Sequence, residues 1–161
     1  MPDVLTKAER SRNMAAIRGK NTTPELQLRS ILHREGYRFR LHAKNVFGKP
    51  DLVFRKHRLA VFVDGCFWHR HHACKFSYTP KSRLDFWLSK FAANVARDRL
   101  VTRRLRATGW RVLRVWECDL VPAKAHNVTA RVRSALQSGL ASRRLYVQRR
   151  RRKSLREGQL L

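Results

Sequence analysis

Acidic residues are scarce in this chain, and long apolar stretches are absent from it. Of 161 residues, 11 are Asp or Glu and 37 are Lys or Arg, so the formal net charge is +26. This imbalance predicts a polyanionic partner. No apolar stretch approaches the roughly 20 residues of a membrane span, and the first residues lack the basic and apolar regions of a secretory signal. We therefore expect an intracellular protein.

Cysteine is also sparse, and the odd number of three argues against a disulfide framework. In a reducing compartment, cysteines close to histidines indicate a metal. Cys66, Cys74 and Cys118 with one imidazole would complete a tetrahedral zinc site. His71 forms the H-x-x-C spacing of zinc knuckles with Cys74, whereas His72 forms a tighter H-x-C; we favour His71 and keep His72 as the alternative. Three ordinary buried cysteines would be the simpler interpretation.

The periodicity of apolar residues predicts an α/β fold with a mixed β-sheet flanked by helices. Thr23, Pro24 and Glu25 are typical of a helix start, and the alternation of apolar and basic residues over 37–41 is typical of a half-buried strand. With 43% apolar residues the chain can bury a core, so we expect one domain over 1–140 and a basic tail over 141–161. The expected helices lie near 5–18, 23–36, 84–108 and 127–137, and the expected strands at 37–41, 51–54, 59–63 and 111–116.

Three acidic residues could share one metal site. Asp51 opens one predicted strand and Asp64 closes the next, and an antiparallel hairpin brings those two ends together. Paired carboxylates suit Mg²⁺, which also takes phosphate oxygens and water. Glu25 could be a third acid, although each of the three also has an ordinary structural explanation.

His69 could be a general base for a water that attacks phosphorus, a zinc ligand, or a surface histidine. Asp98 lies on the same face of the long predicted helix as Trp87 and Phe91, so it points toward the core. A carboxylate there needs a partner. That partner could be an arginine, or a histidine that the carboxylate orients.

Phe67 and Trp68 are adjacent, and neighbouring residues of a strand point in opposite directions. A core could take one of them easily and both only with difficulty. A wedge inserted between base pairs could use both, and we favour this interpretation. The arginine-rich segment 149–153 could add nonspecific attraction to phosphates, or be a solvated tail.

These motifs resemble the very short patch repair endonucleases, over about residues 5–120 and in the same order. The hallmark run is Asp64-Gly65-Cys66-Phe67-Trp68-His69. Four further stretches fit: Arg10-Ser11-Arg12-Asn13-Met14 with Ile17, Gly48-Lys49-Pro50-Asp51, Asn94-Val95-Ala96-Arg97-Asp98-Arg99, and Gly109-Trp110-Arg111-Val112 through Trp116-Glu117-Cys118.

The resemblance implies a restriction-endonuclease-like fold and Mg²⁺-dependent nicking of duplex DNA beside a T:G mismatch that arises from 5-methylcytosine deamination. It implies that Asp51 and the backbone carbonyl of Val63 bind Mg²⁺, and that His69 is the base, hydrogen-bonded to Asp98. The remaining roles that it implies are DNA contacts by Met14 and Ile17 in the minor groove and by Phe67 and Trp68 from the major groove, and structural zinc at Cys66, His71, Cys74 and Cys118.

Asp64 stands where some members of that family carry a histidine, and it could instead contact the metal directly. We expect a monomer acting in the bacterial cytoplasm, at the nucleoid, with a mismatch-repair protein as a candidate partner. Two other functions compete with mismatch nicking. One is a related nuclease with a different DNA target, and the other is a zinc-stabilised DNA-binding protein without catalysis.

Overall fold

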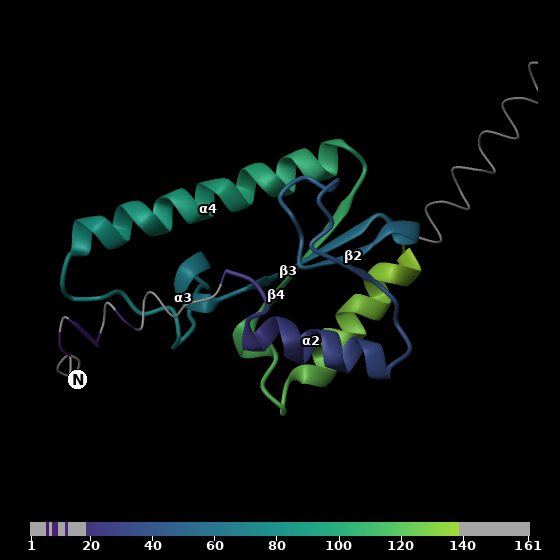
Figure 1. Ribbon diagram of the computed structural model, residues 1–161, viewed down its shortest axis with the longest axis horizontal. Coiled ribbons are helices and arrows are strands. Elements are labelled where there is room, and N and C mark those ends of the chain that lie inside the picture. Colours follow the sequence, from purple (N-terminus) through teal and green to yellow (C-terminus); the bar gives the residue numbers. More distant parts are fainter. Residues whose placement is uncertain (1–5, 7, 10–11, 13–18, 139–161) are drawn as a thin grey trace, which may run out of the picture.

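The computed structural model describes residues 6, 8–9, 12 and 19–138. A central sheet separates two helical layers, with α4 on one face and α2 with a C-terminal helix on the other (Figure 1). The predicted order of helices and strands is confirmed from residue 23 onward. The elements are α2 (Thr23–Arg34), β1 (Arg40–Leu41), β2 (Leu52–Phe54), β3 (Leu59–Asp64), α3 (Cys66–His69), α4 (Leu84–Ala107), β4 (Arg111–Trp116) and a helix over 125–138.

The sheet is mixed, as predicted, with the strand order β1-β2-β3-β4. Strands β1, β2 and β3 are antiparallel neighbours, whereas β4 runs parallel to β3. A parallel neighbour needs a crossover connection, and α3 with α4 provides it. The turn between β2 and β3 is a short 3₁₀ segment, Arg55–His57.

Each face of the sheet has its own apolar core. Leu52, Leu59 and Val61 pack with α2 and the C-terminal helix, while Val53, Ala60 and Phe62 pack with α4 residues Val101 and Leu105. This division follows from the strands, in which successive side chains point to opposite faces.

The same alternation aims polar residues at α4. Asp64 follows the parity of Phe62 on β3, so its carboxylate lies on the α4 face although only 3% of the residue is exposed. Arg114 is the partner of Phe62 in the β3–β4 register and lies on the same face. The sheet therefore presents the Asp64 carboxylate and the Arg114 guanidinium to α4, the helix that carries Asp98.

Two local predictions were wrong. The strand predicted over 37–41 is only Arg40–Leu41, because Tyr37 and Phe39 instead turn their rings edge-on to Phe54, with centroids 6.4 and 5.8 Å away. Thr23, predicted as the cap, is already the first residue of α2; the cap is Thr22, which forms a capping box with Glu25, whose carboxylate accepts a hydrogen bond from the Thr22 N–H at 3.4 Å.

No helix in the described part of the chain is long and apolar enough to cross a membrane. The predicted contacts of Met14 and Ile17 and the basic tail at 141–161 lie outside the described residues.

Candidate active site

The four-residue helix α3 follows β3 directly and holds the motif that dominated the sequence. Gly65 is the residue just before α3, and Arg70 follows the helix with a left-handed backbone (φ 56°) that ends it. The buried amide of Asn94 on α4 donates to the backbone carbonyl of Trp68 at 3.0 Å, which fixes α3 against α4. Asn94 was given no role from the sequence, where it is a polar residue within the apolar stretch 91–96; its burial became evident only once the face of α4 was known.

His69 and Asp98 face each other across α3 and α4. The Nδ1 atom of His69 lies 2.5 Å from Oδ2 of Asp98 and 3.8 Å from Oδ1 of Asp64. No described residue forms a hydrogen bond with the other ring nitrogen, Nε2, so this atom is available to a ligand. A carboxylate at Nδ1 fixes the tautomer in which Nε2 can accept a proton.

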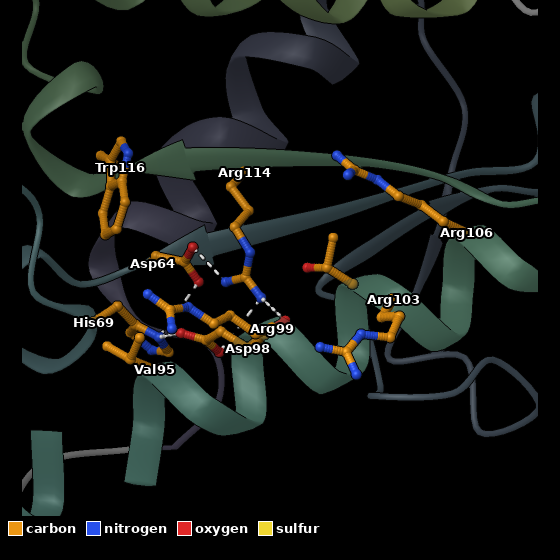
Figure 2. A pocket seen from close by; sticks show the side chains of 10 residues that line it. Asp64, His69, Val95, Asp98, Arg99, Arg103, Arg106, Arg114 and Trp116 are labelled. Carbon is orange, nitrogen blue, oxygen red and sulfur yellow. Dashed lines mark hydrogen bonds and ion pairs between the residues drawn. The ribbon is translucent and has the colours of Figure 1, made fainter. Parts of the chain in front are cut away.

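Arg114 joins the two carboxylates near His69. Its guanidinium donates to Asp64 Oδ2 at 2.6 Å and lies 3.3 Å from Asp98 Oδ1 (Figure 2). The partner of Asp98 was left open between an arginine and a histidine, and the structure has both. Arg114 was missed because its role depends on the β3–β4 register.

The two carboxyl groups respond oppositely to this environment. Burial acts to raise the pKa of Asp98, but the hydrogen bond from His69 and the charges of His69 and Arg114 outweigh it, so that pKa is lowered. Burial raises the pKa of Asp64 despite the charge of Arg114. Asp98 is thus the group held ionised beside the imidazole.

A second cluster joins Glu25, His42 and Asp51, whose ligand atoms all lie within 4.8 Å of one another. Asp51 accepts a hydrogen bond from the Val63 N–H at 2.8 Å. Burial raises the pKa of Asp51 to about 6, and the nearby Glu25 carboxylate adds to the effect. Two carboxylates and an imidazole that crowd together in this way fit a divalent cation.

His42 was not predicted at this site. Leu41, the last residue of β1, is paired with Leu52 in the antiparallel β1–β2 register. The next residue, His42, therefore comes close to Asp51, which precedes Leu52. Glu25 is held in place by Arg29, whose guanidinium donates to its carboxylate at 2.6 Å and also lies 3.1 Å from Nε2 of His42.

One cleft contains both clusters. Asp64 lies beside Arg114 and not in the Glu25 cluster, but it lines the same opening as Asp51. We call this opening the central cleft; its polar and aromatic lining residues are Thr22, Glu25, Asp51, Phe62, Asp64, Trp68, His69, Phe86, Trp87, Lys90, Asn94, Arg97, Asp98, Arg114 and Glu117.

The three cysteines converge on His71. Its Nδ1 atom lies 3.4 Å from Cys66 Sγ and 3.3 Å from Cys118 Sγ, and with Cys74 these ligand atoms lie within 4.8 Å of one another. None of the cysteines forms a disulfide. Three thiols and one imidazole are the donor set of a tetrahedral zinc site.

His72 is exposed and stands outside the group of ligand atoms. The ring of His71 stacks on Trp116, with centroids 4.2 Å apart. The structure therefore favours His71 over His72 as the imidazole that faces the thiols.

Phe67 and Trp68 are both half-buried, and their rings are 5.1 Å apart. The premise that they point in opposite directions was wrong, because α3 is a helical turn and not a strand. Phe67 also packs against Trp87 and Phe91 of α4, at 5.3 and 5.1 Å. Trp68, with Phe86 and Trp87, lines the central cleft.

Comparisons with known proteins identify the family of the chain. Residues 2–75 match the family model of the DNA mismatch endonuclease Vsr. The chain is 49% identical over 136 residues to the type II nicking enzyme V.XorIIP of Xanthomonas oryzae pv. oryzae, over 84% of this chain and 98% of that enzyme. It is 47% identical over 120 residues to the DNA mismatch endonuclease Vsr of Escherichia coli (strain K12), over 74% of this chain and 76% of that enzyme.

The fold is similar to the catalytic domain of the homing endonuclease I-Bth0305I, with a TM-score of 0.52 and 20% identity, over 74% of this chain and 98% of that domain. The family model and the nicking and mismatch enzymes named above show that the chain is a DNA endonuclease. The chain belongs to the Vsr family of DNA mismatch endonucleases, which confirms the resemblance seen in its motifs. The relatives are named as enzymes, so they do not support the alternative of a DNA-binding protein without catalysis.

Proposed function

We propose that this endonuclease nicks one strand of duplex DNA beside a T:G mismatch left by deamination of 5-methylcytosine. The similarity to an enzyme named a DNA mismatch endonuclease supports the mismatch. The single observation that carries the chemistry is the pairing of His69 with Asp98 at 2.5 Å in the cleft that also holds Asp51.

His69 is the proposed general base. Its Nε2 atom takes a proton from a water molecule, while its Nδ1–H donates to the Asp98 carboxylate, which stabilises the imidazolium. The water oxygen forms a bond to phosphorus, the bond from phosphorus to the leaving sugar oxygen breaks, and that oxygen takes a proton from solvent water. Arg114 is a positioning residue, because it holds Asp98 and Asp64 together.

Asp51 and the backbone carbonyl of Val63 would hold Mg²⁺, with Glu25 as a further acid. Bound Mg²⁺ would supply Lewis-acid stabilisation of the charge that develops on the phosphate oxygens. Burial raises the pKa of Asp51 to about 6, and this supports the assignment because a cation offsets the cost of ionising a buried carboxylate. Asp64, in contact with Arg114, would shape the site and could also reach the metal.

Cys66, His71, Cys74 and Cys118 would hold structural zinc. The zinc would join α3 and its following loop to the end of β4, since Cys118 comes just after that strand. A rigid α3 matters because it carries His69.

Trp68 and Phe67 would open the duplex at the mismatch. Trp68 lines the central cleft beside Phe86 and Trp87, and Phe67 packs directly behind it with a ring-centroid distance of 5.1 Å, which supports this role. Aromatic rings that enter a base step offset the cost of unstacking it.

A second candidate is a nicking enzyme that recognises a DNA target other than T:G. The relatives named type II nicking enzymes favour it. Purified protein with Mg²⁺ should nick a T:G duplex and leave the matching T:A duplex largely intact. Equal nicking of both would favour the second candidate, and a panel of T:G duplexes with varied flanking bases would then identify its target.

A further inference from the structure

A row of arginines lines a second hollow beside the active site. Arg99, Arg103 and Arg106 lie on one face of α4, because they are separated by four and three residues. With Arg114 they surround a hollow whose inner end is formed by His69 and Asp98 (Figure 2). We call it the arginine hollow.

These three arginines are exposed on the surface of α4. None of them pairs with an acidic side chain in the part of the chain that the structure describes, and like charges one turn apart repel each other. The nearest carboxylates, Asp64 and Asp98, are already engaged by Arg114. By contrast, the neighbouring Arg104 lies 4.9 Å from the ring of Phe47, where it has a packing partner.

The position of the row identifies its ligand as an anion that continues from the active site. His69, Asp98 and Arg114 line both the central cleft and the arginine hollow. From Arg99 to Arg106 the helix rises by about 10 Å. Along one strand of duplex DNA, this is the rise of about three nucleotides.

We propose that the arginine hollow binds successive backbone phosphates of the DNA strand, on one side of the scissile phosphate. The proposal rests on the proposed strand-nicking function, and it adds the path that the strand follows beyond His69. Guanidinium groups suit phosphate because they donate several hydrogen bonds in a fixed plane.

The contacts are to the backbone and not to bases. The one aromatic residue of the hollow, Trp116, is already stacked on His71 with an interplanar angle of 9°. One face of that ring is therefore already covered, whereas the arginines offer several guanidinium groups to phosphate. Removing the arginines should weaken binding equally for all DNA sequences.

The test compares two triple variants that lose the same charge. One is Arg99→Gln/Arg103→Gln/Arg106→Gln, and the other is Arg34→Gln/Arg38→Gln/Arg133→Gln, whose exposed arginines lie away from α4. The dissociation constant for a T:G and a T:A duplex is measured at several salt concentrations without divalent metal. Circular dichroism checks folding, and the three single variants substitute for a triple variant that does not fold.

Loss of three phosphate contacts should reduce the slope of log affinity against log salt by about 2.7. Between about 50 and about 200 mM salt, the wild-type affinity should then fall about 40-fold more than that of the hollow variant. Each single variant should reduce the slope by about 0.9, and the control triple should keep the wild-type slope. Equal slopes for the two triple variants would overturn the proposal.

Uncharged methylphosphonate linkages locate the contact. Placed singly on one side of the nicked position, they should weaken binding of the wild type and have no effect on the hollow variant. The same weakening in both proteins would also overturn the proposal. This test measures binding, so it is independent of the proposed T:G specificity. If that specificity fails, T:G and T:A duplexes are nicked equally, but the wild type and the hollow variant still differ in the slope of log affinity against log salt.

Discussion

The Nδ1 atom of His69 lies 2.5 Å from the Oδ2 atom of Asp98, although the two residues come from different helices. This contact fixes the ring so that Nε2 is the nitrogen left for substrate. Arg114 then holds Asp98 from the opposite side, at 3.3 Å. The orientation of the proposed base therefore depends on a three-residue chain from β4 through α4 to α3.

The first prediction concerns that chain. Asp98→Asn should lower the single-turnover nicking rate by about 10²–10⁴-fold, because an amide neither fixes the tautomer nor stabilises the imidazolium. Affinity for the T:G duplex, measured without divalent metal, should stay near that of the wild type. Asp85→Asn, an exposed acid in the first turn of the same helix, is the matched control. An unchanged nicking rate in Asp98→Asn would contradict the role of Asp98.

The second prediction concerns the stability of the metal-free protein. Burial raises the folded pKa of Asp51 to about 6, from an ordinary value of 3.8, so folding disfavours its ionised form. Above pH 6 this costs stability, and below about pH 4 the cost disappears because Asp51 is protonated in both states. Asp51→Asn keeps an acceptor for the Val63 N–H and should raise the free energy of unfolding at pH 7.5 by up to about 3 kcal/mol.

Chemical denaturation with chelator at pH 7.5 and at pH 4 checks this, since the advantage of the Asn variant should be lost at pH 4. Mg²⁺ should raise the melting temperature of the wild type and leave that of Asp51→Asn unchanged. A wild type that gains stability relative to the variant as the pH rises would contradict the raised pKa.

The third prediction separates the two candidate zinc ligands. Metal analysis of the purified wild type should give about one equivalent of zinc, as expected for one four-ligand site. His71→Ala should lose most of that zinc and lower the melting temperature, whereas His72→Ala should keep both at wild-type values. Zinc retained by His71→Ala and lost from His72→Ala would reverse the assignment.

The fourth prediction concerns the aromatic wedge. Trp68→Ala should weaken binding to the T:G duplex by about 1–3 kcal/mol, the usual contribution of one stacked base, with a smaller effect on the T:A duplex. Phe76→Ala is the control, because Phe76 is 42% exposed and stands apart from the central cleft. If both variants weaken T:G and T:A binding alike, Trp68 does not act at the mismatch.

Much of this arrangement could be predicted from local sequence. Apolar periodicity gave the sheet and its helices, because each face of a strand or helix buries a regular set of side chains. The three cysteines and His71 stood out by chemical type, and Asp98 stood out as a charge on an apolar helix face. Such features need no knowledge of how distant strands pair.

Most of the missed features depend on strand pairing or on very short elements. Arg114 meets Asp64 only because β4 pairs in parallel with β3 in one register. His42 comes opposite Asp51 only through β1, which has two residues and no apolar pattern. The helical turn of α3 is four residues long, too short for a helical period, so the directions of Phe67 and Trp68 could not be inferred.

The most direct measurement is the single-turnover nicking rate of His69→Ala on a T:G duplex with Mg²⁺, with His72→Ala, in the segment just after α3, as the control. The account predicts that His69→Ala binds the duplex like the wild type and nicks it about 10²–10⁴ times more slowly, while His72→Ala nicks at the wild-type rate. Nicking by His69→Ala at the wild-type rate would show that another group takes the proton from the water.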